Sequence, residues 1–201
     1  MEDTVIHRAV ERQATLRPDV PAVVDGLRTL TYRELNARAN VVARHLVERG
    51  LRRGRLAIVG MERCAELAIT LLAVLKAGAF YEWVDPATSD MNIPVGVTIV
   101  EAETDDTQMG RWVDISAPLS QPIQHATPNL PIVSRGSDIA CALPGFNGQP
   151  LVLVPHATIA GLTVRTFSPT PWDSDPAAFD LWVSLSAGAS VSIVSTAFAA
   201  A

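Results

Sequence analysis

Cysteine is scarce in this chain: Cys64 and Cys141 are the only two in 201 residues, and they form no Cys-x-x-Cys pair. A secreted disulfide scaffold needs several cysteines in a short chain, and a structural zinc site needs closely spaced ligands, so both classes are excluded. We interpret the two thiols as small hydrophobic side chains of a protein in the reducing cytoplasm.

Long hydrophobic runs are also missing. The most apolar window, Leu67–Phe80, is shorter than a membrane span and contains Lys76, so it predicts a core helix. The N-terminal residues Met1-Glu-Asp-Thr do not form a basic stretch followed by an apolar one, which argues against a signal peptide. The sequence therefore predicts a soluble intracellular protein with no membrane partner.

Positive charge is rare in the second part of the chain. Residues 77–201 contain 3 Lys and Arg against 12 Asp and Glu, whereas residues 1–76 contain 13 against 9. We therefore expect no nucleic-acid partner, and we interpret the arginines of the first part as solvated helix faces. With 201 residues and 48% hydrophobic composition, the chain can bury one sizeable core.

The chain opens with a helix and a hairpin. An apolar stripe at helical spacing predicts a first helix that begins after Asp3 or Thr4 as the N-cap and ends before Pro18. Two short strands, Ala22–Val24 and Thr29–Leu30, then flank an Asp-Gly turn.

A strand, helix and strand follow a second, longer helix. Thr31 and Glu34 form a capping-box pattern at the start of this longer helix, which we expect to end at Gly50. The later elements are the strand Arg55–Gly60, the helix Glu62–Lys76 and the strand Ala79–Val84. A strand, helix and strand in this order predict a right-handed crossover and a parallel sheet, so the first 86 residues are α/β.

The same residues carry a family resemblance. The matching blocks are Leu30–Asn36, Arg38–Asn40, Leu72–Tyr81 and Val84–Pro86, with Ala43, Leu46, Gly50 and Gly54. In this order and spacing they resemble the opening of a nonribosomal peptide synthetase adenylation domain, one of the acyl-adenylate-forming ligases. The resemblance covers residues 1–86 and implies parallel or mixed sheets flanked by helices, as in the first part of the N-terminal lobe. Glu82 and Trp83 depart from it, because the family usually has an aliphatic residue and Pro there.

After Pro86 the chain matches the family less closely and is shortened. Where the family has a helix and a strand, we predict only a strand at Gly96–Val100 and a short one at Trp112–Ile115, separated by an acidic run. Four prolines in residues 116–136 predict an ordered crossing loop rather than an interdomain linker. We therefore expect residues 1–201 to form a single truncated domain, with a well-matched half at 1–86 and a degenerate half at 87–201.

Two apolar runs, 139–143 and 150–154, flank a turn in the second half. By the resemblance this turn is a vestigial phosphate loop, with Pro144, Gly145, Asn147 and Gly148 in the loop itself. The family's loop is rich in Ser and Thr and closes on a Pro-Lys-Gly step, whereas residues 139–154 contain no Ser, Thr, Lys or Arg. Adenylate formation holds the ATP phosphates while pyrophosphate leaves, and glycine amides alone do not replace charge-assisted donors. We predict two paired or adjacent buried strands joined by a short turn that holds no nucleotide.

Two further positions are assigned by the resemblance. Asp175 aligns with the carboxylate that binds the substrate's α-amino group; the alternative is an N-cap for the following helix. His156 aligns with a vestigial position at the active-site entrance; the alternative is a cap or packing residue. The other histidines share no metal-ligand spacing with His156 or the cysteines, so no metal site is predicted.

The family's adenine-binding block, ribose-binding Asp and C-terminal lobe with its catalytic Lys are not found in this sequence. We therefore predict a non-catalytic adenylation-domain relic without a cofactor, acting as a structural or protein-interaction module in nonribosomal peptide biosynthesis. Its expected partners are neighbouring synthetase domains, a carrier protein or a second copy of the chain. The alternatives are a residual binder of an amino acid or nucleotide, and a half-ligase completed in trans by another chain.

Overall fold

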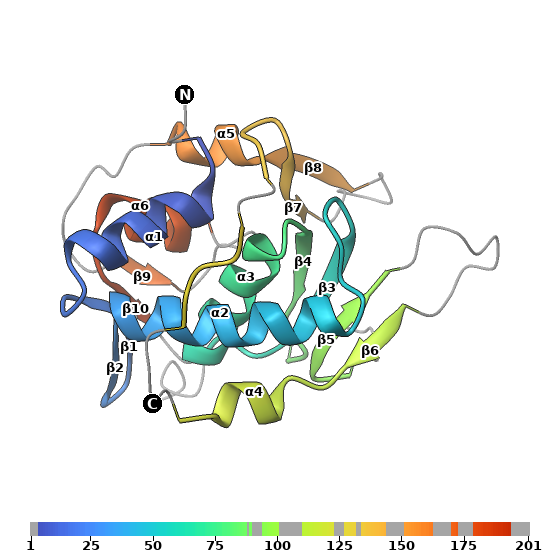
Figure 1. The fold of residues 1–201 in the computed structure, drawn as a ribbon, viewed down its shortest axis with the longest axis horizontal. Helices are drawn as coiled ribbons and strands as arrows, with labels where there is room; N and C mark the ends of the chain where they lie inside the picture. The colour runs from blue at the N-terminus through green and yellow to red at the C-terminus, as the bar shows by residue number, and fades with distance from the viewer. Residues whose placement is uncertain are drawn as a thin grey trace.

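The computed structural model describes residues 4–87, 89, 94–100, 110–122, 127–131, 134–143, 151–162, 170–172 and 179–193. Within these ranges the chain forms two mixed sheets flanked by helices, as the α/β prediction requires (Figure 1). The helices are α1 (Ile6–Leu16), α2 (Tyr32–Glu48), α3 (Ala65–Lys76), α4 (Ser116–Ser120), α5 (His156–Ala160) and α6 (Phe179–Ala187). The strands are β1 (Pro21–Asp25), β2 (Arg28–Thr31), β3 (Leu56–Gly60), β4 (Phe80–Val84), β5 (Gly96–Ile99), β6 (Arg111–Val113), β7 (Ile139–Leu143), β8 (Val152–Pro155), β9 (Thr170–Trp172) and β10 (Val191–Ile193).

The larger sheet has the strand order β6-β5-β3-β4-β7-β8. Its centre is parallel: β3 pairs with β4 through the α3 crossover, as predicted, and β4 pairs with β7. β5 instead runs antiparallel to β3. Only residues 85–95 separate β4 from β5, and so short a connection does not accommodate the crossover that parallel pairing needs.

The smaller sheet joins the two ends of the described chain. The predicted hairpin β1–β2 forms, and β1 also pairs in parallel with β10, with Val23 opposite Val191. β10 then pairs with β9, which gives the order β2-β1-β10-β9. The N-terminal hairpin therefore completes its sheet only with strands from the far end of the sequence.

The predicted N-cap of α1 is wrong. The cap residue is Val5, and no side chain caps the helix. A side chain at Gly136 would collide with the Thr4 hydroxyl, so Thr4 lies against that glycine rather than over the helix amides. Asp3 lies outside the described residues.

The predicted capping box of α2 is confirmed. The Thr31 hydroxyl accepts a hydrogen bond from the Glu34 backbone N–H, and the Glu34 carboxylate accepts one from the Thr31 backbone N–H at 2.8 Å. At the other end, Gly50 follows the helix with φ 103°, a left-handed conformation that favours glycine.

Thr31→Ala should therefore lower the free energy of unfolding by about 1 kcal/mol, because it leaves an N-terminal amide of α2 without its acceptor. Urea denaturation followed by circular dichroism measures the change. Thr31→Ser keeps the hydroxyl and should lose much less; equal losses in the two variants would contradict a capping role.

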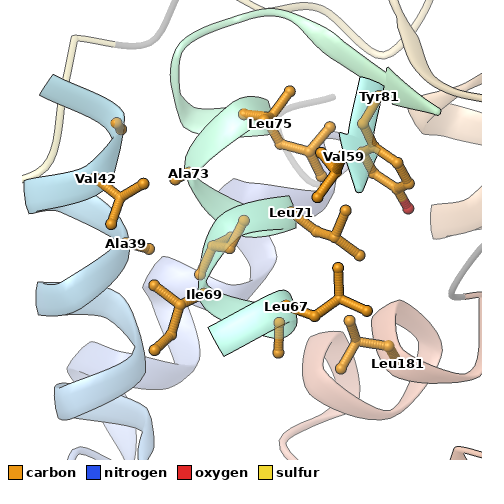
Figure 2. Packing of buried hydrophobic residues seen from close by; sticks show 14 of the residues in the cluster. Ala39, Val42, Val59, Leu67, Ile69, Leu71, Ala73, Leu75, Tyr81 and Leu181 are labelled. Atoms are coloured by element: carbon orange, nitrogen blue, oxygen red, sulfur yellow. The ribbon is translucent and has the colours of Figure 1, made fainter. Parts of the chain in front are cut away.

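Helix α3 is buried on nearly every side, as its sequence predicts (Figure 2). Ala39 and Val42 of α2 face one side of it, while Val59 and Tyr81 of the larger sheet lie beside its Leu71 and Leu75 on another (Figure 2). Among the residues that the structure describes, no helix is long and apolar enough to span a membrane. The most apolar segment of the chain is thus the centre of the core.

Both thiols fit the expectation of small packed side chains. Cys141 is buried in β7 and Cys64 is half-buried before α3, and neither forms a disulfide. Burial raises the pKa of the Cys64 thiol to about 11, so this side chain is protonated at neutral pH.

Candidate functional site

The strands on either side of the predicted phosphate loop are paired, as expected. β7 and β8 run antiparallel, with Cys141 opposite Val154 and Leu143 opposite Val152. Pro144, Gly145, Asn147 and Gly148 fall in residues 144–150, outside the described part of the chain. The hairpin is therefore established, while its turn remains a prediction.

The expectation that both strands are buried is wrong for β8. β7 is buried, but Val152 and Leu153 are 53% and 50% exposed. Among the strands that the structure describes, β8 is the last of its sheet and pairs on one side only. The sequence showed an apolar run, which does not distinguish an edge strand from a central one.

His156 begins α5 directly after β8, and its side chain points into the protein. It is 1% exposed, and its Nδ1 accepts a hydrogen bond from the Ile6 backbone N–H at 3.4 Å. The Asp138 carbonyl accepts a hydrogen bond from the His156 backbone N–H at 3.0 Å. The residue expected at the active-site entrance thus joins the start of α5 to the start of α1.

The ring of His7 meets the ring of His156 edge-on, with 5.8 Å between their centres. His7 is 2% exposed, and its Nδ1 and the Nε2 of His156 have no hydrogen-bond partner among the described groups. Sequence reasoning missed this contact. The one available signal was that His7 adjoins the apolar stripe of the first helix.

Burial keeps both imidazoles neutral. It lowers the pKa of His156 to about 4, against the weaker opposing effect of the Asp138 carboxylate. Burial also lowers the pKa of His7 well below its usual value, and the nearby His156, Lys76 and Arg8 add to this effect.

Asp138 anchors the hairpin from its other side. Its carboxylate bonds to the Arg53 guanidinium at 2.8 Å and accepts the Arg135 backbone N–H at 2.8 Å. Burial alone would raise the pKa of Asp138, but these two partners hold it below its usual value. The loop before β3 is thereby tied to the start of β7.

A buried ion pair lies close to the histidines. Lys76 of α3 donates to the Glu11 carboxylate of α1 and to the Asn129 side chain at 3.2 Å. The Lys76 side chain is 0% exposed and that of Glu11 is 11% exposed. Burial lowers the pKa of Lys76 to about 8, although Glu11 opposes this shift. The sequence contained a signal for this pair, because it places a single lysine in a strongly apolar helix. A buried ammonium group needs a hydrogen-bonding or oppositely charged partner.

Asn129 also connects the proline-rich segment to α2. Its side-chain oxygen accepts hydrogen bonds from Asn36 at 2.9 Å and Asn40 at 3.0 Å. Farther along α2, a surface pocket of about 300 Å³ is lined by Arg44, His45 and Glu48 together with residues of α4. The Arg44 guanidinium donates to the carbonyls of Asn40 and Pro128. Arg44 thus links the proline-rich segment to α2.

The position assigned to the substrate's amino group, Asp175, lies in residues 173–178, which the structure does not describe. The helix expected after it is α6, which begins at Phe179. Trp182 and Leu185 are buried, and Trp182 donates a hydrogen bond to the Tyr81 hydroxyl at 2.6 Å. The geometry of this part supports packing, and Asp175 remains a prediction.

The described arrangement of these side chains holds the core together. Its two imidazoles are closed off from solvent, and its one buried ammonium is paired with a carboxylate. No group of three His, Cys, Asp or Glu side chains within the described ranges is placed to hold a metal ion.

Comparison with known proteins identifies the family to which this chain is similar. Residues 10–102 match the family described as AMP-binding enzyme. Bacitracin synthase 1 of Bacillus licheniformis is 31% identical over 212 aligned residues, which take in 96% of this chain and 4% of the synthase. This chain therefore spans a very small part of that relative.

Solved structures show the same fold. An artificially fused adenylation-PCP di-domain, NpsA-ThdA from Klebsiella oxytoca, has a TM-score of 0.73 at 23% identity over 95% of this chain and 38% of its own. The NpsA N-terminal subdomain from the same organism also has a TM-score of 0.73, at 24% identity over 95% of this chain and 56% of its own. The sequence matches and the fold together show that the chain is related to the N-terminal part of the adenylation domains of nonribosomal peptide synthetases.

Proposed function

We propose that this chain is a non-catalytic adenylation-domain relative that serves as a structural or protein-interaction module in nonribosomal peptide biosynthesis. The observation that carries the proposal is the β7–β8 hairpin: it keeps the family's strands, while residues 139–154 contain no Ser, Thr, Lys or Arg to bind a triphosphate. Holding ATP while pyrophosphate leaves requires such donors.

The position of His156 also supports a packing role for this part of the fold. Its ring is neutral and buried against α1, so it neither donates a proton to a substrate nor contacts one without the hairpin moving. The partners we propose are neighbouring synthetase domains or a carrier protein, since an adenylation domain fused to a PCP has this fold.

ATP–pyrophosphate exchange tests the proposal most directly. With each proteinogenic amino acid in turn, the purified chain should give no exchange above the protein-free reaction, because the hairpin sequence has lost its phosphate-binding side chains. Exchange with any amino acid would contradict the proposal. Exchange that appears only after a second chain of the synthetase is added would favour the half-ligase completed in trans.

Calorimetry separates the module from a residual binder. Titration of the chain with ATP and with amino acids should give no heat of binding. Heat with an amino acid that is lost in Asp175→Asn would instead favour a residual amine-binding site at that position.

A further inference from the structure

The side-chain oxygen of Asn129 accepts hydrogen bonds from three side chains. The amides of Asn36 and Asn40 on α2 donate to it at 2.9 and 3.0 Å, and the ammonium of Lys76 on α3 donates to it at 3.2 Å. Asn40 and Lys76 are buried, whereas Asn129 is an exposed residue of the proline-rich segment. We call Asn36, Asn40 and Lys76 the donor set.

The donor set offers more hydrogen bonds than one carbonyl oxygen accepts. Such an oxygen has two lone pairs, whereas the two oxygens of a carboxylate together have about four acceptor positions. Asn36 and Asn40 turn their NH2 groups towards Asn129, although this leaves their own oxygens buried and without a hydrogen-bond partner among the described groups. The arrangement therefore suits an acceptor with more capacity than the amide that it holds.

The charges around the donor set also favour an anion. Lys76 bonds to the carboxylate of Glu11, while Arg44, among the residues that the structure describes, donates to carbonyls alone. Burial lowers the pKa of Lys76 to about 8, Glu11 opposes this shift, and the nearby Arg44 guanidinium adds to it. Two cations thus share one carboxylate. A second carboxylate would accept charge-assisted hydrogen bonds, which are roughly twice as strong as those between neutral groups.

We propose that the donor set is a carboxylate-binding site, which the wild-type chain fills from within by the amide of Asn129. Because Asn129 lies at the surface, a carboxylate reaches the donors once this side chain is removed or turns away. The tethered amide has a high effective concentration, so a free carboxylate competes with it only weakly in the wild-type protein. The proline-rich segment is therefore an internal ligand of the site. This inference goes beyond the proposed function, and the outcome of pyrophosphate exchange does not bear on it.

Lys76 is the single lysine of the chain, so isotope-labelled lysine gives one side-chain NMR signal, which reports directly on the site. Asn129→Ala removes the amide, and titration with sodium acetate should then shift this signal saturably. Acetamide has nearly the same shape but no charge, so it should bind about tenfold more weakly than acetate. The wild-type chain should also bind acetate at least about tenfold more weakly than Asn129→Ala, because its own amide competes. Sodium chloride at equal ionic strength should give no saturable shift.

Asn129→Asp supplies the carboxylate within the chain. It should shift the Lys76 signal in the direction that acetate does in Asn129→Ala, raise the midpoint of thermal unfolding above that of the wild type, and abolish the response to acetate. Gln121→Ala, which removes an exposed amide elsewhere in residues 116–136, should behave as the wild type does.

Circular dichroism shows whether each variant is folded. A folded Asn129→Ala without a saturable acetate shift, or with equal affinity for acetate and acetamide, would overturn the inference. An Asn129→Asp variant that melts below the wild type would overturn it as well. This last comparison decides the matter on its own if Asn129→Ala does not fold.

Discussion

Acidification from pH 7 towards pH 4 should destabilise the protein by about 3 kcal/mol through His156 alone, with a further loss through His7. The folded protein holds the pKa of His156 at about 4, below the usual value of 6.5, because the ring is buried. The unfolded chain therefore binds more protons between these two pH values. Stability is fully present above about pH 6.5 and is lost as the pH falls through this window.

Urea denaturation at intervals between pH 7 and pH 4 measures this loss. His156→Gln removes the titrating ring and should flatten the profile, even though it lowers stability at pH 7. His45→Gln, which changes a half-exposed imidazole on α2, should leave the profile steep. The carboxylate of Asp138 does not account for the same loss, because its pKa lies below 3.8 and so below this window. A profile that is equally steep in His156→Gln would show that the buried ring of His156 is not the cause.

Glu11→Gln should lower the free energy of unfolding by about 3 to 5 kcal/mol at neutral pH. The change leaves the Lys76 ammonium, whose side chain is 0% exposed, without its counter-charge. The folded pKa of Lys76, already lowered to about 8, should fall further. Between this lower value and about 8, the folded wild-type protein binds more protons than the folded variant, whereas the unfolded lysine is protonated in both, so the loss should shrink as the pH rises through 8 towards 9.

Two variants separate this buried pair from ordinary charge effects. Glu66→Gln breaks the more exposed pair with Arg28 and should cost less than about 1 kcal/mol. The double variant Glu11→Leu with Lys76→Met replaces the pair by apolar groups and should recover most of the stability. A loss in Glu11→Gln that matches Glu66→Gln, or that does not change with pH, would show that Lys76 finds another partner or solvent.

Local sequence patterns predicted the first half of the fold because its contacts are close in sequence. The capping box of Thr31 and Glu34 involves residues three positions apart, and the β3–α3–β4 unit follows from one apolar helix between two short apolar runs. The pairing of β1 with β10 could not be predicted in the same way. The local sequence around Val23 and Val191 does not indicate that the two residues pair. Their pairing depends on the packing of the whole core.

The candidate site was predicted less completely, for two physical reasons. The resemblance placed the β7–β8 pairing correctly, but the hydropathy of residues 151–153 did not show that β8 is an edge strand. His156 was assigned from its position after a strand, whereas its environment is set by His7 at the other end of the sequence. Burial and pKa depend on such distant neighbours, which a local pattern does not contain.

The pairing of β1 with β10 has a consequence for how the protein is made. On the ribosome, the outer edge of the β1–β2 hairpin stays without its neighbour until Val191 has been synthesised and has left the exit tunnel. At ordinary elongation rates this interval is on the order of ten seconds or more. During this interval the edge of β1, which contains Val23 and Val24, is unpaired and accessible to other chains. We therefore expect the yield of soluble protein in cells to depend on chaperones that protect nascent chains.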